Sequence, residues 1–408
     1  MRLKDLVYIN SSTLPEDTNS SYCFNYIDIS SVSGEGEISM DTCYNFGEAP
    51  SRARRIVKKG DVLISTVRTY LRAIAAIDFD AKDIVASTGF AVCSPKKNIA
   101  SKYLSYAVRN NLVIADICKE STGVSYPAIP AATLSSIEIP FCEIAEQRAI
   151  ADYLDKKTAE IDTQISLLEN KQKAYEKLKC SLIDKVVTCG LNPDVELKDS
   201  GIDWIGEIPV HWDVKRIKDV AELGSGTTPK STNEKYYDDG IHPWLITADV
   251  QNRLVESNDN FITDLALTET PNLKLYPTKT VLLAMYGGGT IGNVGLMTYP
   301  AYINQACCAM MPKSDIFEKY LFYYLLTKQK RIISTGVGGT QINLSQSKIS
   351  AYPISVPPLI EQKKIANYLD EKAAEIDECI SLTDKKIKAY KRLKQSLIDE
   401  VVTGKRKI

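Results

Sequence analysis

Histidine is nearly absent from this 408-residue chain, which contains only His211 and His242. Ser-His and Cys-His catalysis both need a histidine beside the nucleophile, and zinc sites take histidines or cysteines at characteristic spacings. The ten cysteines are scattered and form no C-x-x-C pair. We therefore expect buried free thiols in place of metal ligands.

Long apolar runs and an excess of either charge are also missing. No stretch approaches the roughly 18 apolar residues of a membrane span. The opening MRLKDLVYIN has no signal-peptide core, so we expect a cytoplasmic protein with no membrane partner. A net charge of −1 is not typical of a protein that coats nucleic acid nonspecifically, although cations can still gather on one face. The length predicts two or three domains.

The usual catalytic motifs are not found either. MYGGGTIGNVG (285–295) is rich in glycine, but it lacks the lysine of a G-x-x-x-x-G-K-[ST] loop and the order of G-x-G-x-x-G. A tight turn is the better interpretation of this segment. No G-x-S-x-G occurs. The sequence thus predicts a non-catalytic chain, with no catalytic, cofactor-binding or metal-binding residues of its own.

One long segment, in contrast, is present twice. Residues 146–188 and 361–403, 215 positions apart, share 28 identities in 43 positions. Such a match indicates duplication. Apolar residues recur in both copies at intervals of three, four and seven, which predicts long helices with one apolar side. Prolines and acidic residues precede each copy, as expected where a helix begins. Gly190 and Gly404 follow the copies, where a glycine in the left-handed conformation typically ends a helix.

Helices of about 43 residues would be on the order of 65 Å long and need a partner in water. The simplest partner is the other copy, in a two-stranded coiled coil. The alternative is that each helix packs only on its own domain. Leu168 is matched by the polar Thr383. The residues expected to pair the helices are Ile150, Leu154, Ile161, Ile165, Leu182, Ile365, Leu369, Ile376, Ile380 and Leu397.

The segments before the two helices are alike but diverged. VLISTVR (62–68) is in register with VLLAMYG (281–287), and STGV occurs at Ser121 and at Ser334. Short β-branched runs such as DVLIST and YPISVP alternate with helical stretches, which predicts α+β heads. The expected organisation is a first head over 1–145, a helix over 146–190, a loop-like linker over 191–213, a second head over 214–360, and a helix with a tail over 361–408.

Candidate nucleic-acid contacts lie in the heads. Cations in SRARRIVKKG and just after it could follow phosphates or contact guanine edges, although a solvated basic face is the alternative. The candidate contacts in the second head are lysines, a tyrosine and two side-chain amides, and the amides are suited to adenine edges. The candidates are Arg52, Arg54, Arg55, Lys58, Lys59, Arg68, Arg72, Lys230, Lys235, Tyr236, Gln341 and Asn343.

Taken together, these features resemble a known family, the specificity (S) subunits of type I DNA restriction–modification systems. The phrases EQRAIADYLDKKTAEID and EQKKIANYLDEKAAEID are similar to those that the family uses, as are SLIDKVVTCG, SLIDEVVTGK, STGFAVCSP and DSGIDWIGEIPVHWDVKRIKD. The resemblance covers nearly the whole chain. One departure is that the first head has no DWIGEIPVHWD lead-in; either that packing is missing there or the tail GKRKI takes its place.

The resemblance implies an α+β fold in which two target recognition domains are each followed by a long helix. The helices would form an antiparallel coiled coil with pseudo-twofold symmetry. Each domain would recognise one half of a bipartite, asymmetric site in double-stranded DNA, and the helices would set the spacer. Two methyltransferase (M) subunits and the restriction (R) subunits would be partners, with S-adenosylmethionine, ATP and Mg bound in those partners. The alternative function is a non-catalytic scaffold whose heads bind proteins; a catalytic chain ranks behind it.

Overall fold

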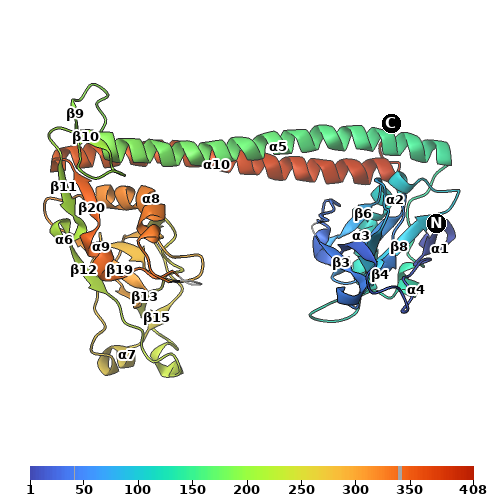
Figure 1. The fold of residues 1–408 in the computed structure, drawn as a ribbon, viewed down its shortest axis with the longest axis horizontal. Helices are drawn as coiled ribbons and strands as arrows, with labels where there is room; N and C mark the ends of the chain where they lie inside the picture. The colour runs from blue at the N-terminus through green and yellow to red at the C-terminus, as the bar shows by residue number, and fades with distance from the viewer. Residues whose placement is uncertain (41, 339–341) are drawn as a thin grey trace. The chain divides into compact units, whose positions relative to one another are not determined.

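The computed structural model describes residues 1–40, 42–338 and 342–408, and it divides into two compact units. The first unit comprises Met1–Asn170 and Asp384–Ile408, and the second comprises Lys171–Thr383. Figure 1 shows two long helices, α5 (Ile144–Cys189) and α10 (Leu359–Val402). Each helix contributes one part to either unit. Each unit therefore contains one head and a segment of both helices.

The first head contains two four-stranded sheets. One has the order β1-β8-β5-β6 with antiparallel neighbours, and the other has the order β3-β2-β7-β4 with β2 and β7 parallel. The strands are β1 (Val7–Ile9), β2 (Cys23–Ile27), β3 (Cys43–Asn45), β4 (Ala53–Ile56), β5 (Val62–Ser65), β6 (Ile74–Ala76), β7 (Ile84–Ser87) and β8 (Phe90–Pro95). The helices are α1 (Leu3–Leu6), α2 (Ser101–Val108), α3 (Asn111–Lys119) and α4 (Ala131–Leu134).

The second head has the same plan with local additions. Its main sheet has the order β12-β19-β16-β17-β14, and a smaller sheet has the order β15-β13-β18 with β13 and β18 parallel. Its strands are β11 (Asp213–Arg216), β12 (Ala221–Ser225), β13 (His242–Leu245), β14 (Arg253–Val255), β15 (Phe261–Ile262), β16 (Val281–Ala284), β17 (Val294–Met297), β18 (Tyr302–Ile303), β19 (Cys307–Pro312) and β20 (Pro353–Val356). Its helices are α6 (Ile217–Val220), α7 (Asp264–Glu269), α8 (Glu318–Ser334) and α9 (Gln346–Ala351).

The duplication seen in the helices therefore extends to the sheets. The series β1-β8-β5-β6 corresponds to β12-β19-β16-β17, and the parallel pair β2–β7 corresponds to β13–β18. β5 and β16, the two strands predicted from VLIS and VLLA, are buried at every position, as a central strand covered on both faces requires. The expected α+β fold is confirmed.

Both long helices end as their sequences predict. Gly190 and Gly404 follow the last turns with φ of +79° and +72°, a conformation that glycine adopts without Cβ strain. Glu146 and Glu361 lie in the first turns, where their charge is favourable to the helix dipole. Thr383, the polar counterpart of Leu168, is 5% exposed and donates its hydroxyl to the Cys379 carbonyl, so the helix accommodates it without an unpaired group.

The segment 191–213, expected to be loop-like, is more ordered than its composition indicates. It contains the antiparallel hairpin of β9 (Leu197–Asp199) and β10 (Glu207–Pro209). Ile208 and Trp212 are fully buried against Val187 and Ile365 of the long helices. Trp212 also donates its indole N–H to Glu361 at 3.1 Å. The tail after Gly404 is exposed, so it does not supply comparable packing in the first unit.

Residues 101–113 (SKYLSYAVRNNLV) form two helices, whereas the corresponding segment of the second head is the single helix α8. α2 ends at Val108, and Asn110 caps α3 by accepting the Leu112 N–H at 2.9 Å. The β-branched run SIEIP (136–140) forms no strand in the described structure and contributes an isolated bridge between Arg2 and Glu138.

All ten cysteines are free, but only Cys93, Cys307 and Cys308 are buried. Burial raises the pKa of the Cys93 and Cys308 thiols to about 12. Within the described ranges, no helix is both long and apolar enough to cross a membrane.

Candidate nucleic-acid interface

An exposed hairpin stands beside a tight turn in the first head. Thr122 and Ala128 exchange two backbone hydrogen bonds of 2.9 Å, and the intervening residues form the hairpin tip. The Ile129 N–H donates to the Thr66 carbonyl at 2.8 Å, which attaches the hairpin to the turn that follows β5. At the tip, Val124 is fully exposed and the Tyr126 side chain is 62% exposed. Apolar side chains held in solvent on an ordered hairpin are typical of a contact surface.

The second head has an equivalent antiparallel bridge, and we call the described residues around it, 337, 338, 342 and 343, the second hairpin. Val337 and Asn343 exchange two backbone hydrogen bonds of 3.0 Å, and the Leu344 N–H donates to the Met285 carbonyl at 2.8 Å. Here the adjoining turn is the glycine segment between β16 and β17, in which Gly287 and Gly289 have positive φ as the turn prediction requires. Gln341, a predicted contact, lies outside the described residues.

Two of the predicted cations in the first head meet in one groove. Arg52 and Arg68 line it together with Tyr126, Asp28, Ser30 and Leu71. The Arg68 guanidinium lies 4.3 Å from the centroid of the Tyr126 ring. Arg52 is exposed at the turn that precedes β4. The hairpin and the cationic segment, more than fifty residues apart in sequence, therefore form one surface.

The remaining cations of the first head have other environments. The Arg54 guanidinium lies 4.6 Å from the Phe46 ring centroid, and Arg55 donates weakly to Thr13 at 3.4 Å while its buried Nε has no partner among the described atoms. Lys58 and Lys59 are exposed in the turn between β4 and β5. Arg72 has φ of +57° and lines a different hollow, beside the long helices.

The predicted contacts of the second head also separate. Lys230, Lys235 and Asn343 are exposed. Tyr236 is 8% exposed within a cluster that includes Trp244 and Ile262, and its hydroxyl donates to Glu269. Its inclusion among the DNA contacts is therefore corrected: Tyr236 is buried in this cluster, and its hydroxyl is already hydrogen-bonded to Glu269.

Most of the residues predicted to pair the helices lie in or against hydrophobic clusters that the helices share with the heads. In each unit, one hydrophobic cluster contains residues of α5, of α10 and of the adjoining head. The helix residues in the first cluster include Ile150, Leu154, Leu397, Ile398, Val401 and Val402, and those in or against the second include Ile365, Leu369, Leu182, Ile183, Val186 and Val187. Each residue of one set lies 215 positions from an identical residue of the other. At these residues, packing on a head is combined with packing between the two helices.

The other predicted pairing positions are less enclosed. Ile161 is partly buried against the first cluster, and Ile165 is 8% exposed. Ile376 and Ile380 are half-buried. The apolar side of the helices is therefore best covered where a head joins it.

A set of polar contacts, which we call the head–helix joint, is built twice. In the first unit, Asp155 of α5 accepts hydrogen bonds from Lys102 at 2.5 Å and from the Tyr106 hydroxyl at 2.8 Å. In the second, Asp370 of α10 accepts from Lys319 at 2.5 Å and from Tyr323 at 2.7 Å. Burial, followed by smaller effects that include the hydrogen bond to the carboxylate, raises the pKa of both tyrosines.

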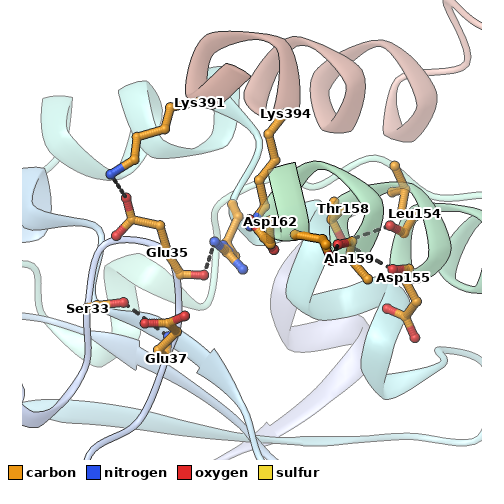
Figure 2. Close-up of polar contacts among 12 residues, drawn as sticks. Ser33, Glu35, Glu37, Leu154, Asp155, Thr158, Ala159, Asp162, Lys391 and Lys394 are labelled. Carbon is orange, nitrogen blue, oxygen red and sulfur yellow. Dashed lines mark hydrogen bonds and ion pairs between the residues drawn. The ribbon is translucent and has the colours of Figure 1, made fainter. Parts of the chain in front are cut away.

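Ion pairs between the helices also repeat. Lys394 Nζ lies 2.6 Å from an Asp162 carboxylate oxygen in the first unit, and Lys179 lies 2.6 Å from Asp377 in the second. In both units an early residue of one helix meets a late residue of the other, so the two helices are antiparallel. Figure 2 shows the first of these pairs beside Asp155 and Thr158.

One contact of the first head has no counterpart among the described residues of the second. Glu35, in the loop before β3, lies 3.9 Å from Lys391 of α10 (Figure 2). The Glu35 carbonyl also accepts a hydrogen bond from Arg109. The residue equivalent to Lys391 in the second unit is Glu176, whose charge is opposite. The two heads are therefore held by a shared joint with additions specific to each.

Tyr126, Val124, Val337 and Ile342 were not among the sequence-based candidates, although all four are exposed at the hairpins. The repeated STGV was the available signal. The two copies of STGV do not superpose position by position. Thr122, the second residue of one copy, occupies the bridge position that Val337, the fourth residue of the other copy, occupies in the second head.

Two diverged heads, each joined in the same way to a pair of antiparallel helices and each carrying an exposed hairpin, define a two-headed recognition protein. Residues 1–170 and 209–390 match the model of the type I restriction modification DNA specificity domain, and the chain belongs to that family.

Curated relatives agree with this assignment. The chain is 33% identical over 181 residues to the MjaIX specificity subunit of Methanocaldococcus jannaschii, covering 43% of this chain and 40% of that one. It is 23% identical over 405 residues to the HindI specificity subunit of Haemophilus influenzae, covering 83% and 87%. The similarity to the EcoR124I/EcoR124II specificity subunit of Escherichia coli covers 57% of this chain and 53% of that one. The aligned region is thus less than two thirds of the first and last of these relatives.

Solved structures share the fold. A chain from a structural study of assembly and conformational transition in the type I R-M system superposes with a TM-score of 0.78 at 22% identity, covering 100% of this chain and 97% of that one. The HsdS subunit of Thermoanaerobacter tengcongensis gives a TM-score of 0.52 at 22% identity, covering 100% and 96%.

Proposed function

We propose that this chain selects the DNA sequence for a type I restriction–modification complex, each head recognising one half of a bipartite, asymmetric duplex site. The observation that carries the proposal is the pair of equivalent hairpins on matched scaffolds with different side chains. Tyr126 stands beside Arg68 in the first head, whereas glycines adjoin Val337 and Asn343 in the second. Two heads that share a fold but differ in their exposed side chains are suited to recognise two different half-sites.

The paired helices would determine the spacer between the half-sites. Support comes from the head–helix joint, in which each head is attached at Asp155 or Asp370 by a charged and a neutral donor. Bonds to a charged acceptor are stronger than neutral ones, so each head is oriented firmly on its helix.

The chemistry would be supplied by other subunits. In this proposal, two methyltransferase subunits that bind S-adenosylmethionine and restriction subunits that use ATP and Mg assemble on this chain. The relatives' designation as specificity subunits of type I restriction enzymes supports that division of labour. The chain itself would bind, orient and space the DNA, without a reacting group of its own.

The test is duplex binding and methylation by the chain together with its methyltransferase subunits. We expect N6-methyladenine at a single bipartite motif across the genome of a host that has no other methyltransferase. Binding of that motif should fall steeply with salt, by roughly a thousandfold between 50 and 200 mM for about six phosphate contacts.

Two results would contradict the proposal. Unchanged methylation after deletion of this chain would remove it from target selection. Binding of a protein partner without any duplex preference would favour the protein-binding scaffold instead.

A further inference from the structure

Arg68 has an unusually fixed backbone for an arginine on a surface. Its φ is +51°, and its N–H donates to the Pro127 carbonyl at 2.7 Å. The next residue, Thr69, is 4% exposed, and its hydroxyl lies 3.0 Å from that of Ser121. The turn and the hairpin therefore hold each other, and the Arg68 Cα has little freedom.

The Arg68 side chain is braced as well. Its guanidinium carbon lies 4.3 Å from the centroid of the Tyr126 ring. Tyr126 itself is 62% exposed, so the pair stands at the surface. No carboxylate of the described residues lies within 4.0 Å of the guanidinium. A stacked arginine with unused donors is prepared for an external acceptor, and stacking reduces the rotamer freedom lost on binding.

The surroundings distinguish this cation from its neighbours. Arg68 and Arg52 line a groove with Tyr126, where Asp28 is the only carboxylate among the lining residues. Lys58 and Lys59 are exposed on a turn, without an aromatic ring within cation–π distance among the described residues. A flexible ammonium group suits a phosphate, whereas the planar guanidinium can donate to two acceptors of one base at once.

We propose that Arg68, braced on Tyr126, recognises a guanine edge in the half-site of the first head, by donating to guanine O6 and N7. This inference rests on the proposed function and adds the residue and the base. Among base edges in the major groove, guanine alone offers two neighbouring acceptors for such a bidentate contact.

The experiment measures binding of the chain with its methyltransferase subunits to duplexes in which each base pair of the first half-site is varied. We expect Arg68→Ala to lose discrimination at one G·C pair by roughly 5- to 150-fold and to leave the second half-site unchanged. Arg68→Lys should lose the same discrimination, because the lysine ammonium group lacks the planar guanidinium that can donate two parallel hydrogen bonds. Tyr126→Phe keeps the stacking ring and should retain the wild-type preference.

A modified base makes the test specific for the contact. With 7-deazaguanine at that pair, which lacks the N7 acceptor, the wild-type complex should bind more weakly, while the Arg68→Ala complex should bind both duplexes equally. Lys59→Ala is the matched control and should weaken every duplex by the same factor.

Uniform weakening by Arg68→Ala, with the base preference intact, would overturn the inference and make Arg68 a phosphate contact. Arg68→Lys retains the positive charge and the aliphatic part of the side chain. If the alanine variant unfolds, the lysine variant can therefore still distinguish a base contact from a phosphate contact. If the wild-type complex shows no base preference at any position, the proposed function itself is wrong, and that result is visible before any variant is compared.

Discussion

At the scale of single residues, two buried glutamines show how completely the joint was duplicated. Gln147 accepts the Ala100 N–H at 2.9 Å and donates to the carbonyls of Asn98 and Cys142. Gln362 accepts the Phe317 N–H at 2.8 Å and likewise donates to two carbonyls. Both side chains are fully buried. Each glutamine thus pairs three main-chain groups that would otherwise be buried without partners.

We expect Gln147→Leu and Gln362→Leu to destabilise the protein by similar amounts, about 2–4 kcal/mol each, because leucine leaves those main-chain groups unpaired. Denaturant unfolding measures the loss. Hydrogen exchange should locate it, in α2 and the start of α5 for Gln147→Leu and in α8 and the start of α10 for Gln362→Leu.

Gln164→Leu, at an exposed position of α5, is the matched control and should change the free energy of unfolding by less than about 0.5 kcal/mol. Equal effects of Gln147→Leu and Gln164→Leu would show that the buried amide does not hold the joint.

At the scale of elements, the ion pairs define the register of the two helices. The repeat of 215 residues relates the two ion pairs to each other: Asp162 corresponds to Asp377, and Lys179 corresponds to Lys394. In both pairs the aspartate faces solvent, and ion pairs with such access to water contribute about 1 kcal/mol or less each. The apolar clusters therefore account for most of the pairing, and the charges mainly select its register.

That register permits a direct test of spacing. Four residues inserted after Glu160 in α5 and four after Gln395 in α10 would lie opposite each other, so the pairs on both sides are kept. The insertion adds about 6 Å and rotates the following segment by roughly 40°. We expect a spacer longer by about two base pairs, with both half-sites unchanged, when the methylated motif is mapped.

Inserting the four residues in α5 alone is the control, since it displaces Asp162 from Lys394 and should lower stability. An altered half-site at the original spacer length, after the matched insertion, would contradict spacing by the helices.

At the scale of the whole molecule, the chain is two versions of one unit with different additions. The first head contacts α10 through Glu35 and Lys391, and the second packs on its lead-in through Trp212. The joint is common to both, whereas the hairpins differ.

Exchange of residues 1–145 for the corresponding head of another family member should therefore change one half-site only. The incoming head must supply lysine and tyrosine at the positions of Lys102 and Tyr106, because Asp155 remains in the helix. Mapping of the methylated motif before and after the exchange is the measurement. A change in both half-sites would mean that the heads do not act separately.

The sequence alone determined the duplication, the two helices with their glycine ends, and the α+β heads. These depend on local periodicity and on an internal comparison, and both are readable along the chain. Ile150 and Ile365, or Gly190 and Gly404, follow rules that involve neighbours within one or two turns.

Only the tertiary structure decided which residues share a surface. It placed Tyr126 over Arg68, brought Tyr236 into a core, and buried Trp212 of a segment whose composition indicates a loop. Each of these outcomes depends on contacts between residues distant in sequence, such as the hydrogen bond from Ile129 to Thr66. Burial of an aromatic side chain depends on what the fold brings against it, and no local pattern in the chain contains that information.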